Sequence, residues 1–340
     1  MNEKQNVALL YGGRGAEHEI SVRSAKFVLP LIDREHFNPY PILIKKDGSS
    51  VLCPPESRED AGIRAELCRG GIRTVDGTVP ISAALPLLHG DHGEDGEVQG
   101  LLLSDNIPTV GCGVSAGAVS SDKAYTKLCA ESLGIPTAEW ILSVAGSKTR
   151  GKDISVRRAE LSFGYPMFVK PAGLGSSFGA SVATCREELL TSYDAAASIG
   201  CGRVIIEEKI SVISELECGY FSAKGKELFT KIGEISSKGR FYGFDEKYST
   251  DSDFHIYTVS PREEEYGQVI RSYARALTEL IGIRHLGRFD FFLSEDGRLL
   301  FNEVNTMPGF TAGSLYPRML ESMGLSPAEA INLMLEDAVT

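Results

Sequence analysis

A short stretch near the end of the chain carries two carboxylates that could hold a metal ion. Asp296-Gly297 separates two apolar runs, and this arrangement predicts a β-hairpin with a two-residue loop. Such a loop pairs Glu295 with Arg298, and it therefore places Asp290 directly opposite Glu303. Two carboxylates that face each other across a sheet repel, so a positive charge must compensate them.

The same pairing adds a guanidinium and an amide to this face of the hairpin. Arg288 falls opposite Asn305, and strand alternation places both beside Asp290 and Glu303. The other face is apolar and carries Phe289, Phe291 and Val304. Oxygen ligands without histidine or cysteine suit Mg²⁺, which commonly bridges carboxylates and phosphates. The alternative is a structural ion-pair network in which Arg288 neutralises the acids.

A loop rich in glycine and serine follows a predicted strand that ends at Lys170. Residues 173–179 contain three glycines and two serines, whose backbone N–H groups and hydroxyls can surround phosphate oxygens. Lys170 offers a point charge to the same anion. The loop is not a Walker A motif, because it lacks GK[ST] and is followed by a strand. It also misses GxGxxG, since Phe178 stands at the third glycine position. A plain mobile turn is the alternative.

The first turn of the chain could bind an amino acid. Residues 11–19 follow the first strand and open a helix, but His18 stands where a dinucleotide fingerprint needs its third glycine. A helix N-terminus favours a carboxylate or a phosphate. Glu17 beside it could hold an ammonium group, so the turn offers a partner for both charges of an amino acid.

Two further polar segments could contribute to a site. Residues 89–96 contain two histidines and three acids after a buried strand, which suits either a transition metal or, as we favour, polar loop chemistry with one histidine near a substrate. Residues 236–253 have the length and composition of a lid over a site, with a mobile surface loop as the alternative.

Alternating strand and helix patterns position these residues. Strands are expected at 7–11, 40–45, 81–88, 140–144, 165–170, 180–183 and 203–208, and the hairpin at 288–304; helices are expected at 17–32, 97–104, 115–133, 186–198 and 263–281. Ser260 and Ser326 each precede a proline and a glutamate at helix-start spacing, so we expect both to be N-caps. The first third predicts a parallel sheet, and three domains are expected, at 1–120, 121–216 and 217–340.

Composition excludes several classes of protein. The net charge of −11 argues against nucleic acid or an anionic membrane as the main partner. We expect no secretory signal and no membrane span, because the first apolar run covers only residues 7–11. The seven cysteines are scattered without a CxxC pair, which favours a reducing cytoplasm over a thiolate metal site.

In combination, these segments resemble the D-alanine–D-alanine ligase family, and the resemblance covers almost the whole chain. The matching stretches, in order, are 12–21, 88–96, Ser121-Asp122-Lys123, Lys170-Pro171 through 177, Asp245-Glu246-Lys247-Tyr248, 287–290 and 302–311. The resemblance implies a three-domain ATP-grasp fold, α/β and α+β in class, with an N-terminal parallel-sheet domain and ATP between the central and C-terminal domains. It also implies peptidoglycan precursor synthesis in the cytoplasm, and a homodimer is the family expectation.

The resemblance assigns ligand-binding roles to particular residues. The ATP site would comprise Lys123, Lys170, Ser177, Glu207, Glu208, Ile210, Glu215 and Lys247. Two Mg²⁺ ions, with Mn²⁺ as a substitute, would be held by Asp290, Glu303 and Asn305, in agreement with the hairpin argument. His89 would lie near the first D-alanine, and Ser314 and Leu315 would line the subsite of the second.

The implied reaction has two steps. The carboxylate of one D-alanine attacks the γ-phosphate of ATP to give an acyl phosphate, and the amine of a second D-alanine then displaces phosphate. The residues implied in catalysis are Glu17, with Ser176 and Tyr248 hydrogen-bonded to it, and the oxyanion hole of Arg288 and Gly309.

Three other functions remain as alternatives. A D-alanine–D-serine or D-alanine–D-lactate ligase would keep the mechanism, although Tyr248 and Leu315 favour D-alanine. A non-catalytic nucleotide-binding protein is disfavoured by the complete set of charged residues, and a nicotinamide-dependent oxidoreductase by the missing glycine at His18. The chain departs from the family pattern at Gly173, Phe178 and Ala312-Gly313, which affects loop closure and the second subsite.

Overall fold

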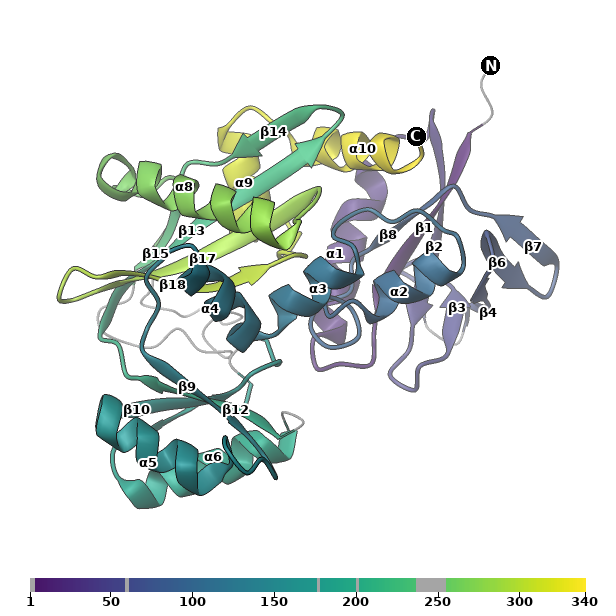
Figure 1. Cartoon of the computed structure of the whole chain (residues 1–340). Coiled ribbons are helices and arrows are strands. Elements are labelled where there is room, and N and C mark those ends of the chain that lie inside the picture. The colour runs from purple at the N-terminus through teal and green to yellow at the C-terminus, as the bar shows by residue number, and fades with distance from the viewer. Residues whose placement is uncertain (1–3, 59–60, 176–177, 200–201, 237–254) are drawn as a thin grey trace.

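The computed structural model contains three main β-sheets (Figure 1). The structure describes residues 4–58, 61–175, 178–199, 202–236 and 255–340. Among these residues, no helix is both long and apolar enough to cross a membrane. The sheets follow one another along the chain, so each main sheet is built from one continuous part of the sequence.

The N-terminal sheet confirms the predicted parallel core. β1 (Gln5–Gly12) pairs in parallel with β2 (Phe37–Ile44) and with β8 (Ala83–Pro86). The short strands β3 (Ser50–Leu52) and β4 (Ile63–Arg64) extend the sheet in antiparallel fashion, which the sequence pattern did not predict. A separate hairpin sheet contains β5 (Glu66–Cys68), β6 (Gly71–Thr74) and β7 (Gly77–Pro80). Helix α1 (His18–Val28), the 3₁₀ turn η1 (Leu29–Leu31) and α2 (Glu97–Ser104) complete this part.

The helix predicted over residues 115–133 is two helices. α3 (Val114–Ser121) ends at Asp122, whose extended backbone interrupts the helix, and α4 (Lys123–Ser132) begins at the next residue. The Asp122 side chain accepts the N–H groups of Ala124 and Tyr125 and so caps α4. The break fixes Lys123 at the first position of a new helix, facing the glycine-rich loop, where its N–H donates to the Ala172 carbonyl at 2.8 Å.

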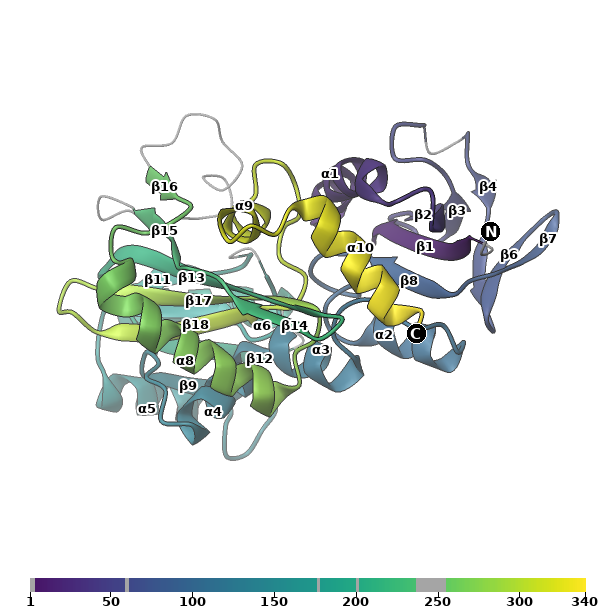
Figure 2. The same cartoon turned by 90° about the horizontal axis from the view of Figure 1, so that it is seen from above.

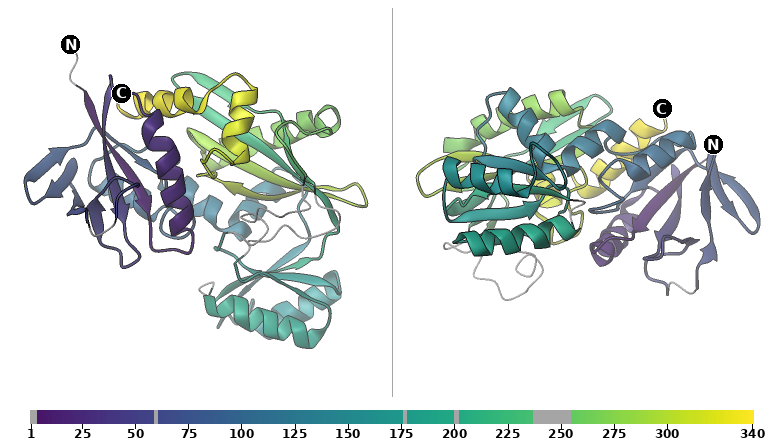
Figure 3. Two further views of the ribbon diagram at one scale, coloured as in Figure 1. Left: turned by 180° about the vertical axis from the view of Figure 1, so that it is seen from behind. Right: turned by 60° about the horizontal axis from the view of Figure 1, so that its bottom comes forward.

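The central sheet is small and antiparallel. Its order is β11 (Ser181–Ala183), β10 (Met167–Pro171), β12 (Arg203–Glu208) and β9 (Trp140–Val144). α5 (Lys152–Ser162), which the sequence pattern did not predict, and α6 (Arg186–Ile199) pack together on its outer face (Figure 3). The opposite, inner face of the central sheet is directed towards the C-terminal sheet.

The C-terminal sheet has the order β16 (His255–Tyr257), β15 (Gly233–Ser236), β13 (Val212–Ala223), β17 (Leu286–Ser294) and β18 (Leu299–Asn305), with β14 (Lys226–Phe229) paired to β13. α8 (Glu263–Ile281) covers one face, where Phe289, Phe291 and Val304 are buried as expected. α9 (Leu315–Ser322) and α10 (Pro327–Ala338) follow. The domain boundary expected at 216/217 falls inside β13, and α4 packs on β18 and α8 while its Ala124 also packs against Ile205 of the central sheet.

The hairpin of β17 and β18 has the predicted pairing at its site end but not at its loop. Leu293 pairs with Leu299 and the Ser294 N–H donates to the Arg298 carbonyl, so the loop has three residues, 295–297, and Glu295 is not opposite Arg298. Gly297 has a φ of +81°, as the left-handed residue of a three-residue loop requires. A bulge at Asn302 then restores the register, and Asp290 lies opposite Glu303 after all.

The two predicted helix starts differ. Ser326 caps α10 by accepting the Glu329 N–H at 3.2 Å, as predicted. Ser260 is not the N-cap of α8, since the helix begins at Glu263 and the flanking residue is Arg262. The Ser260 hydroxyl accepts the Arg262 N–H at 2.9 Å in the turn before the helix, and it donates to the buried Glu234 carboxylate.

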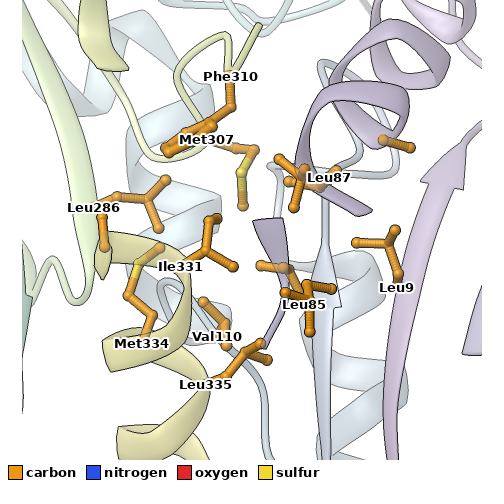
Figure 4. Close-up of a cluster of buried hydrophobic side chains, with 14 of the residues drawn as sticks. Leu9, Leu85, Leu87, Val110, Leu286, Met307, Phe310, Ile331, Met334 and Leu335 are labelled. Atoms are coloured by element: carbon orange, nitrogen blue, oxygen red, sulfur yellow. The ribbon is translucent and has the colours of Figure 1, made fainter. Parts of the chain in front are cut away.

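The N-terminal and C-terminal sheets share one apolar core. α10 lies between them (Figure 2), and its side chains Ile331 and Leu335 pack in the same cluster as Leu85 of β8 (Figure 4). Met307 and Phe310, from the loop after β18, enter this cluster as well. The last helix of the chain therefore joins the first domain to the last.

Candidate active site

A pocket lies between the inner face of the central sheet and the C-terminal sheet; we call it the intersheet pocket. Its polar lining includes the described residues Lys123, Lys127, Lys170, Glu207, Glu208, Lys209, Ser211, Glu215, Asp290, Glu295, Asn302 and Glu303, and its apolar lining includes Phe168, Phe178, Ile210, Phe292 and Leu300. All the ATP-binding residues expected from the sequence that the structure describes line this one pocket. Two of the three expected metal ligands, Asp290 and Glu303, lie there as well.

Three carboxylates form a row across three neighbouring strands. Glu217 of β13 pairs with Asp290 of β17, which pairs with Glu303 of β18. Glu217 and Asp290 are buried, with 4% and 7% of their surface exposed. Glu217 was not predicted, yet strand alternation puts it on the same face as the predicted Glu215, around the buried Leu216.

Arg288 neutralises two members of this row. Its Nε and Nη2 atoms donate to Asp290 at 2.7 and 2.6 Å, and its Nε lies 3.3 Å from Glu217 Oε2. Burial opposes the charge of the guanidinium, but Asp290 and Glu217 outweigh it and raise the pKa of Arg288. Asn305 Nδ2 donates to Asp290 at 2.9 Å. The alternative ion-pair network is thus present among the protein groups themselves.

Glu303 has a different cation. Lys123 Nζ lies 3.0 Å from Glu303 Oε2 and donates to the Leu174 carbonyl at 2.8 Å. Burial by itself lowers the pKa of Lys123, but Glu303 more than compensates and the net pKa is raised. Lys123 therefore connects the β17–β18 hairpin to the glycine-rich loop.

A second buried ion-pair cluster lies deeper in the intersheet pocket. Glu207 forms ion pairs with Lys127 through one oxygen at 2.9 Å and with Lys170 through the other at 2.8 Å. Burial would raise the pKa of Glu207, but the two lysines lower it to about 2. Glu207 was expected at the adenine site; it lines the pocket, but its carboxylate is directed to the lysines. Lys127 was missed, although it lies one helical turn after Lys123 on α4.

The remaining expected ATP residues line the same pocket. Glu208 pairs with Arg298 at 2.9 Å and accepts the Glu139 N–H at 3.0 Å. Ile210 is buried and Glu215 stands on β13, two residues before Glu217. Their carboxylates and the apolar side chain offer polar and apolar contacts within this pocket.

Glu17 lies where three segments meet. It precedes α1, and a Cβ added to Gly90 would come within 2.2 Å of its carboxylate oxygen. A Cβ on Gly175 would lie 3.6 Å from the same atom. The structure therefore brings together the first turn, the 89–96 loop and the glycine-rich loop around Glu17.

His89 is buried and both its ring nitrogens have protein partners. Nε2 lies 3.0 Å from the Ser24 hydroxyl, and Nδ1 lies 3.1 Å from the Met307 carbonyl. A carbonyl can only accept, so Nδ1 carries the proton and Nε2 accepts from Ser24. Burial lowers the pKa of His89 and keeps it neutral. A metal bound by His89 would have to displace one of these partners.

The transition-metal alternative concerns other residues of the same loop. His92, Asp95 and Glu97 bring their ligand atoms within 4.8 Å of one another. His92 Nδ1 is already hydrogen-bonded to Glu97, and both side chains are exposed. Exposed, mutually paired groups of this kind need no ion, so this cluster gives the alternative no additional support.

The second-subsite residues lie after β18. A Cβ on Gly309 would be 3.1 Å from the Ser314 hydroxyl, which accepts the Thr311 N–H at 3.1 Å. Leu315 is the first residue of α9 and is buried against Gly233 and Met319. Its role in the second subsite stays a prediction. Ser176, Ser177, Lys247 and Tyr248, with most of the expected lid, lie outside the described residues.

Comparison with known proteins identifies two family domains. Residues 6–112 match the family described as D-ala D-ala ligase N-terminus, and residues 129–336 match D-ala D-ala ligase C-terminus. The D-alanine–D-alanine ligase of Deinococcus radiodurans is 39% identical, with 99% of both chains covered. That of Caldicellulosiruptor bescii is 33% identical, with 99% of this chain and 95% of the relative covered.

Solved structures agree with the sequence comparisons. D-alanyl-alanine synthetase A from Vibrio cholerae superimposes with a TM-score of 0.87 at 30% identity, covering 99% of this chain and 98% of that one. The VanG D-Ala:D-Ser ligase from Enterococcus faecalis has a TM-score of 0.87 at 26% identity, covering 98% and 99%. The fold is therefore ATP-grasp, and the chain is an ATP-dependent ligase that belongs to the D-alanine–D-alanine ligase family.

Proposed function

We propose that this enzyme joins two D-alanine molecules into D-alanyl-D-alanine, at the expense of ATP, for peptidoglycan precursors. The observation that carries the proposal is the row of Glu217, Asp290 and Glu303 beside Lys123 at one end of the intersheet pocket. A row of acids next to a lysine suits a metal–triphosphate complex. Glu17, in the adjoining loop cluster, supplies the partner for an ammonium group.

ATP would lie in the intersheet pocket between the two sheets. Lys123 and Lys170 would contact its phosphates, while Glu208, Ile210 and Glu215 would take the base and ribose end. Each lysine now holds a carboxylate, so binding of the triphosphate would exchange one anionic partner for another. The assignments of Ser177 and Lys247 rest on the family resemblance alone.

The residues of the hairpin fit magnesium. The donor set contains only carboxylate and amide oxygens, which suits a hard divalent cation, and the paired carboxylates require positive charge. Asp290, Glu303 and Asn305 would hold two Mg²⁺ ions, with Mn²⁺ as a substitute. Bound there, the ions would neutralise phosphate charge during phosphoryl transfer.

The chain's own residues would then orient two displacements. Glu17 holds the ammonium of the first D-alanine, with Ser176 and Tyr248 as its expected partners, so that its carboxylate faces the γ-phosphorus. Attack forms the acyl phosphate and releases ADP. The amine of the second D-alanine adds to the acyl carbon, Arg288 and the Gly309 N–H stabilise the oxyanion, and phosphate leaves with the C–O bond electrons.

The choice of second substrate is assigned to Ser314 and Leu315. An apolar subsite rejects an added hydroxyl only weakly, so D-serine would be a poor but measurable acceptor. We also propose that the enzyme is a cytoplasmic homodimer. Light scattering of the purified protein measures its molar mass, and the mass of a single chain would contradict the dimer.

The test is ADP release with ATP and Mg²⁺, with D-alanine, D-serine, D-lactate or L-alanine offered alone and then paired with D-alanine. We expect turnover with D-alanine alone, and the dipeptide as the product by mass spectrometry. Product only when D-serine or D-lactate is added would keep the chemistry but reject the D-alanine assignment. ATP binding without turnover on any of these substrates would reject the function.

A further inference from the structure

Both backbone groups of Met307 are hydrogen-bonded to side chains of the N-terminal domain. Its N–H donates to Glu94 Oε1 at 3.0 Å, and its carbonyl accepts the Nδ1 proton of His89 at 3.1 Å. These contacts join residues 213 and 218 positions apart. We call this arrangement the Met307 clamp, and it crosses from the N-terminal domain to the C-terminal one.

The clamp is anchored on both sides by burial. The Met307 side chain enters the apolar core shared by the two domains, near Leu87 and Phe310 (Figure 4). On the other side, His89 is fixed by the Ser24 hydroxyl of α1. Neither the peptide nor the histidine can shift without breaking a hydrogen bond in a buried place.

Glu94 also organises its own loop. Its second oxygen, Oε2, accepts the Gly90 N–H at 3.0 Å. A Cβ on Gly90 would come within 2.2 Å of the Glu17 carboxylate oxygen, so the Gly90 backbone lies against that side chain. The Glu94 carboxyl group therefore accepts a hydrogen bond on one oxygen from Gly90, which faces Glu17. On the other oxygen it accepts one from Met307, two residues before Gly309.

We propose that Glu94 is a positioning residue for the ligation reaction, which fixes the Gly309 N–H relative to the Glu17 carboxylate. The proposal rests on the proposed function, in which these two groups act on opposite ends of the first substrate. A displacement of about 1 Å between such groups lowers rates by about a hundredfold. Glu94 itself need touch no substrate to have this effect.

The proposal can be tested by replacing one carboxyl oxygen of Glu94 with an NH2 group. Both partners of Glu94 are N–H donors, so both of its oxygens must accept. Burial, and then the Glu17 carboxylate, raise the pKa of Glu94 to about 8, but a protonated carboxyl still has an accepting lone pair on each oxygen. A glutamine has the same size but only one acceptor, so Glu94→Gln must lose one of the two contacts.

The experiment compares wild type, Glu94→Gln and Glu66→Gln. Glu66 is an exposed carboxylate on β5, paired with Arg64, and serves as the matched control. We expect Glu94→Gln to lower kcat by about a hundredfold while the KM for ATP stays within about twofold. Glu66→Gln should match wild type. If the substitution only destabilised the fold, the apparent kcat would fall in proportion to the fraction of folded enzyme. That fraction is measured from the melting curve of the variant.

Hydrogen exchange of the peptide that spans Met307 provides a readout without substrates. We expect faster exchange at Met307 in Glu94→Gln and no change in Glu66→Gln. Unchanged exchange, or faster exchange with normal kcat, would overturn the positioning role. If wild type makes no dipeptide while the exchange still responds, the clamp stands as a contact between the domains, but the proposed function and the positioning role of Glu94 in it both fall.

Discussion

The intersheet pocket and the Met307 clamp hold their polar groups in opposite ways. In the pocket, charged side chains pair with one another: Lys123 with Glu303, and Glu207 with two lysines. In the clamp, side chains pair with the backbone of one residue, Met307. Paired side chains can exchange partners when a charged ligand binds, whereas the Met307 backbone, hydrogen-bonded on both sides, stays in place. The pocket is therefore suited to binding and the clamp to positioning.

This difference also has an energetic side. Buried ion pairs contribute little net stability, since desolvation offsets their attraction, but removal of one partner is costly. The intersheet pocket holds its charges in paired form, so that ATP and Mg²⁺ would replace partners that are already present. The following predictions test whether the intersheet pocket serves binding and the Met307 clamp serves positioning.

The largest effect is expected at the acidic row. Asp290→Asn keeps the size of the side chain but removes a proposed metal ligand and the main partner of Arg288. We expect kcat to fall about a thousandfold, equivalent to about 4 kcal/mol, together with a lower melting temperature, because the buried Arg288 loses one of its two carboxylate partners. Steady-state ADP release and a thermal melt would measure both.

Asp296→Asn is the control for that change, because Asp296 lies in the loop of the same hairpin and is exposed. It should leave kcat near wild type. Equal activity of the two variants would show that the acidic row does not bind the metal–nucleotide complex, and the pocket would lose its assigned role.

The next effect concerns the buried cluster around Glu207. Glu207→Gln leaves Lys127 and Lys170 without their shared counter-ion, and we expect the free energy of unfolding at pH 7 to fall by about 3 kcal/mol. The pKa of Glu207 is about 2 in the folded protein and 4.5 without perturbation. Its contribution is therefore present above pH 4.5 and is lost as the pH falls towards 2.

Urea unfolding at pH 7 and pH 3 measures this dependence. The stability difference between wild type and Glu207→Gln should shrink at pH 3. A difference that is the same at both pH values would mean that the cluster is not held by charge, and the contrast with the Met307 clamp would disappear.

The sequence could predict the parts of the site whose members lie on one local element. Asp290, Glu303 and Asn305 were placed together because a hairpin brings near residues into register, although two departures cancelled: a longer loop and the bulge at Asn302. Glu217 and Lys127 had local signals, since each shares a strand face or helix face with a residue that was predicted.

The Met307 clamp had no such signal. Glu94 and Met307 meet only because α10 and the loop after β18 pack against the N-terminal sheet, and no period or motif in the sequence encodes that docking. The break at Asp122 was missed for a local reason: aspartate can leave the helix and cap the next one, which a helix pattern over 115–133 does not distinguish.

A third prediction separates Glu17 from the nucleotide end. Gly90→Ala would place a methyl group about where the Glu17 carboxylate oxygen lies, at a residue with φ of +67°. The carboxylate is the movable partner, so we expect it to be displaced and the KM for D-alanine to rise about tenfold, which is about 1.4 kcal/mol. The KM for ATP should not change. Initial rates at varied D-alanine and saturating ATP measure the shift.

Gly70→Ala is the matched control, since Gly70 has φ of +71° but open space around it. It carries the same backbone strain without the contact with Glu17. Should both variants raise the KM equally, the effect would be one of strain, and the proximity of the 89–96 loop to Glu17 would have no functional meaning.

The smallest effect tests whether the apolar contact between the domains, as distinct from the Met307 clamp, matters for chemistry. Ser326→Ala removes the hydroxyl that accepts the Glu329 N–H at the start of α10, the helix that joins the two domains. We expect a loss of about 1 kcal/mol in the free energy of unfolding and a kcat within twofold of wild type. Ser326→Asp keeps an acceptor and should retain the stability. A large fall in kcat with Ser326→Ala would instead mean that loosening α10 is enough to misplace the loop that carries Gly309. The packing of α10, and not the two hydrogen bonds on Met307, would then position Gly309.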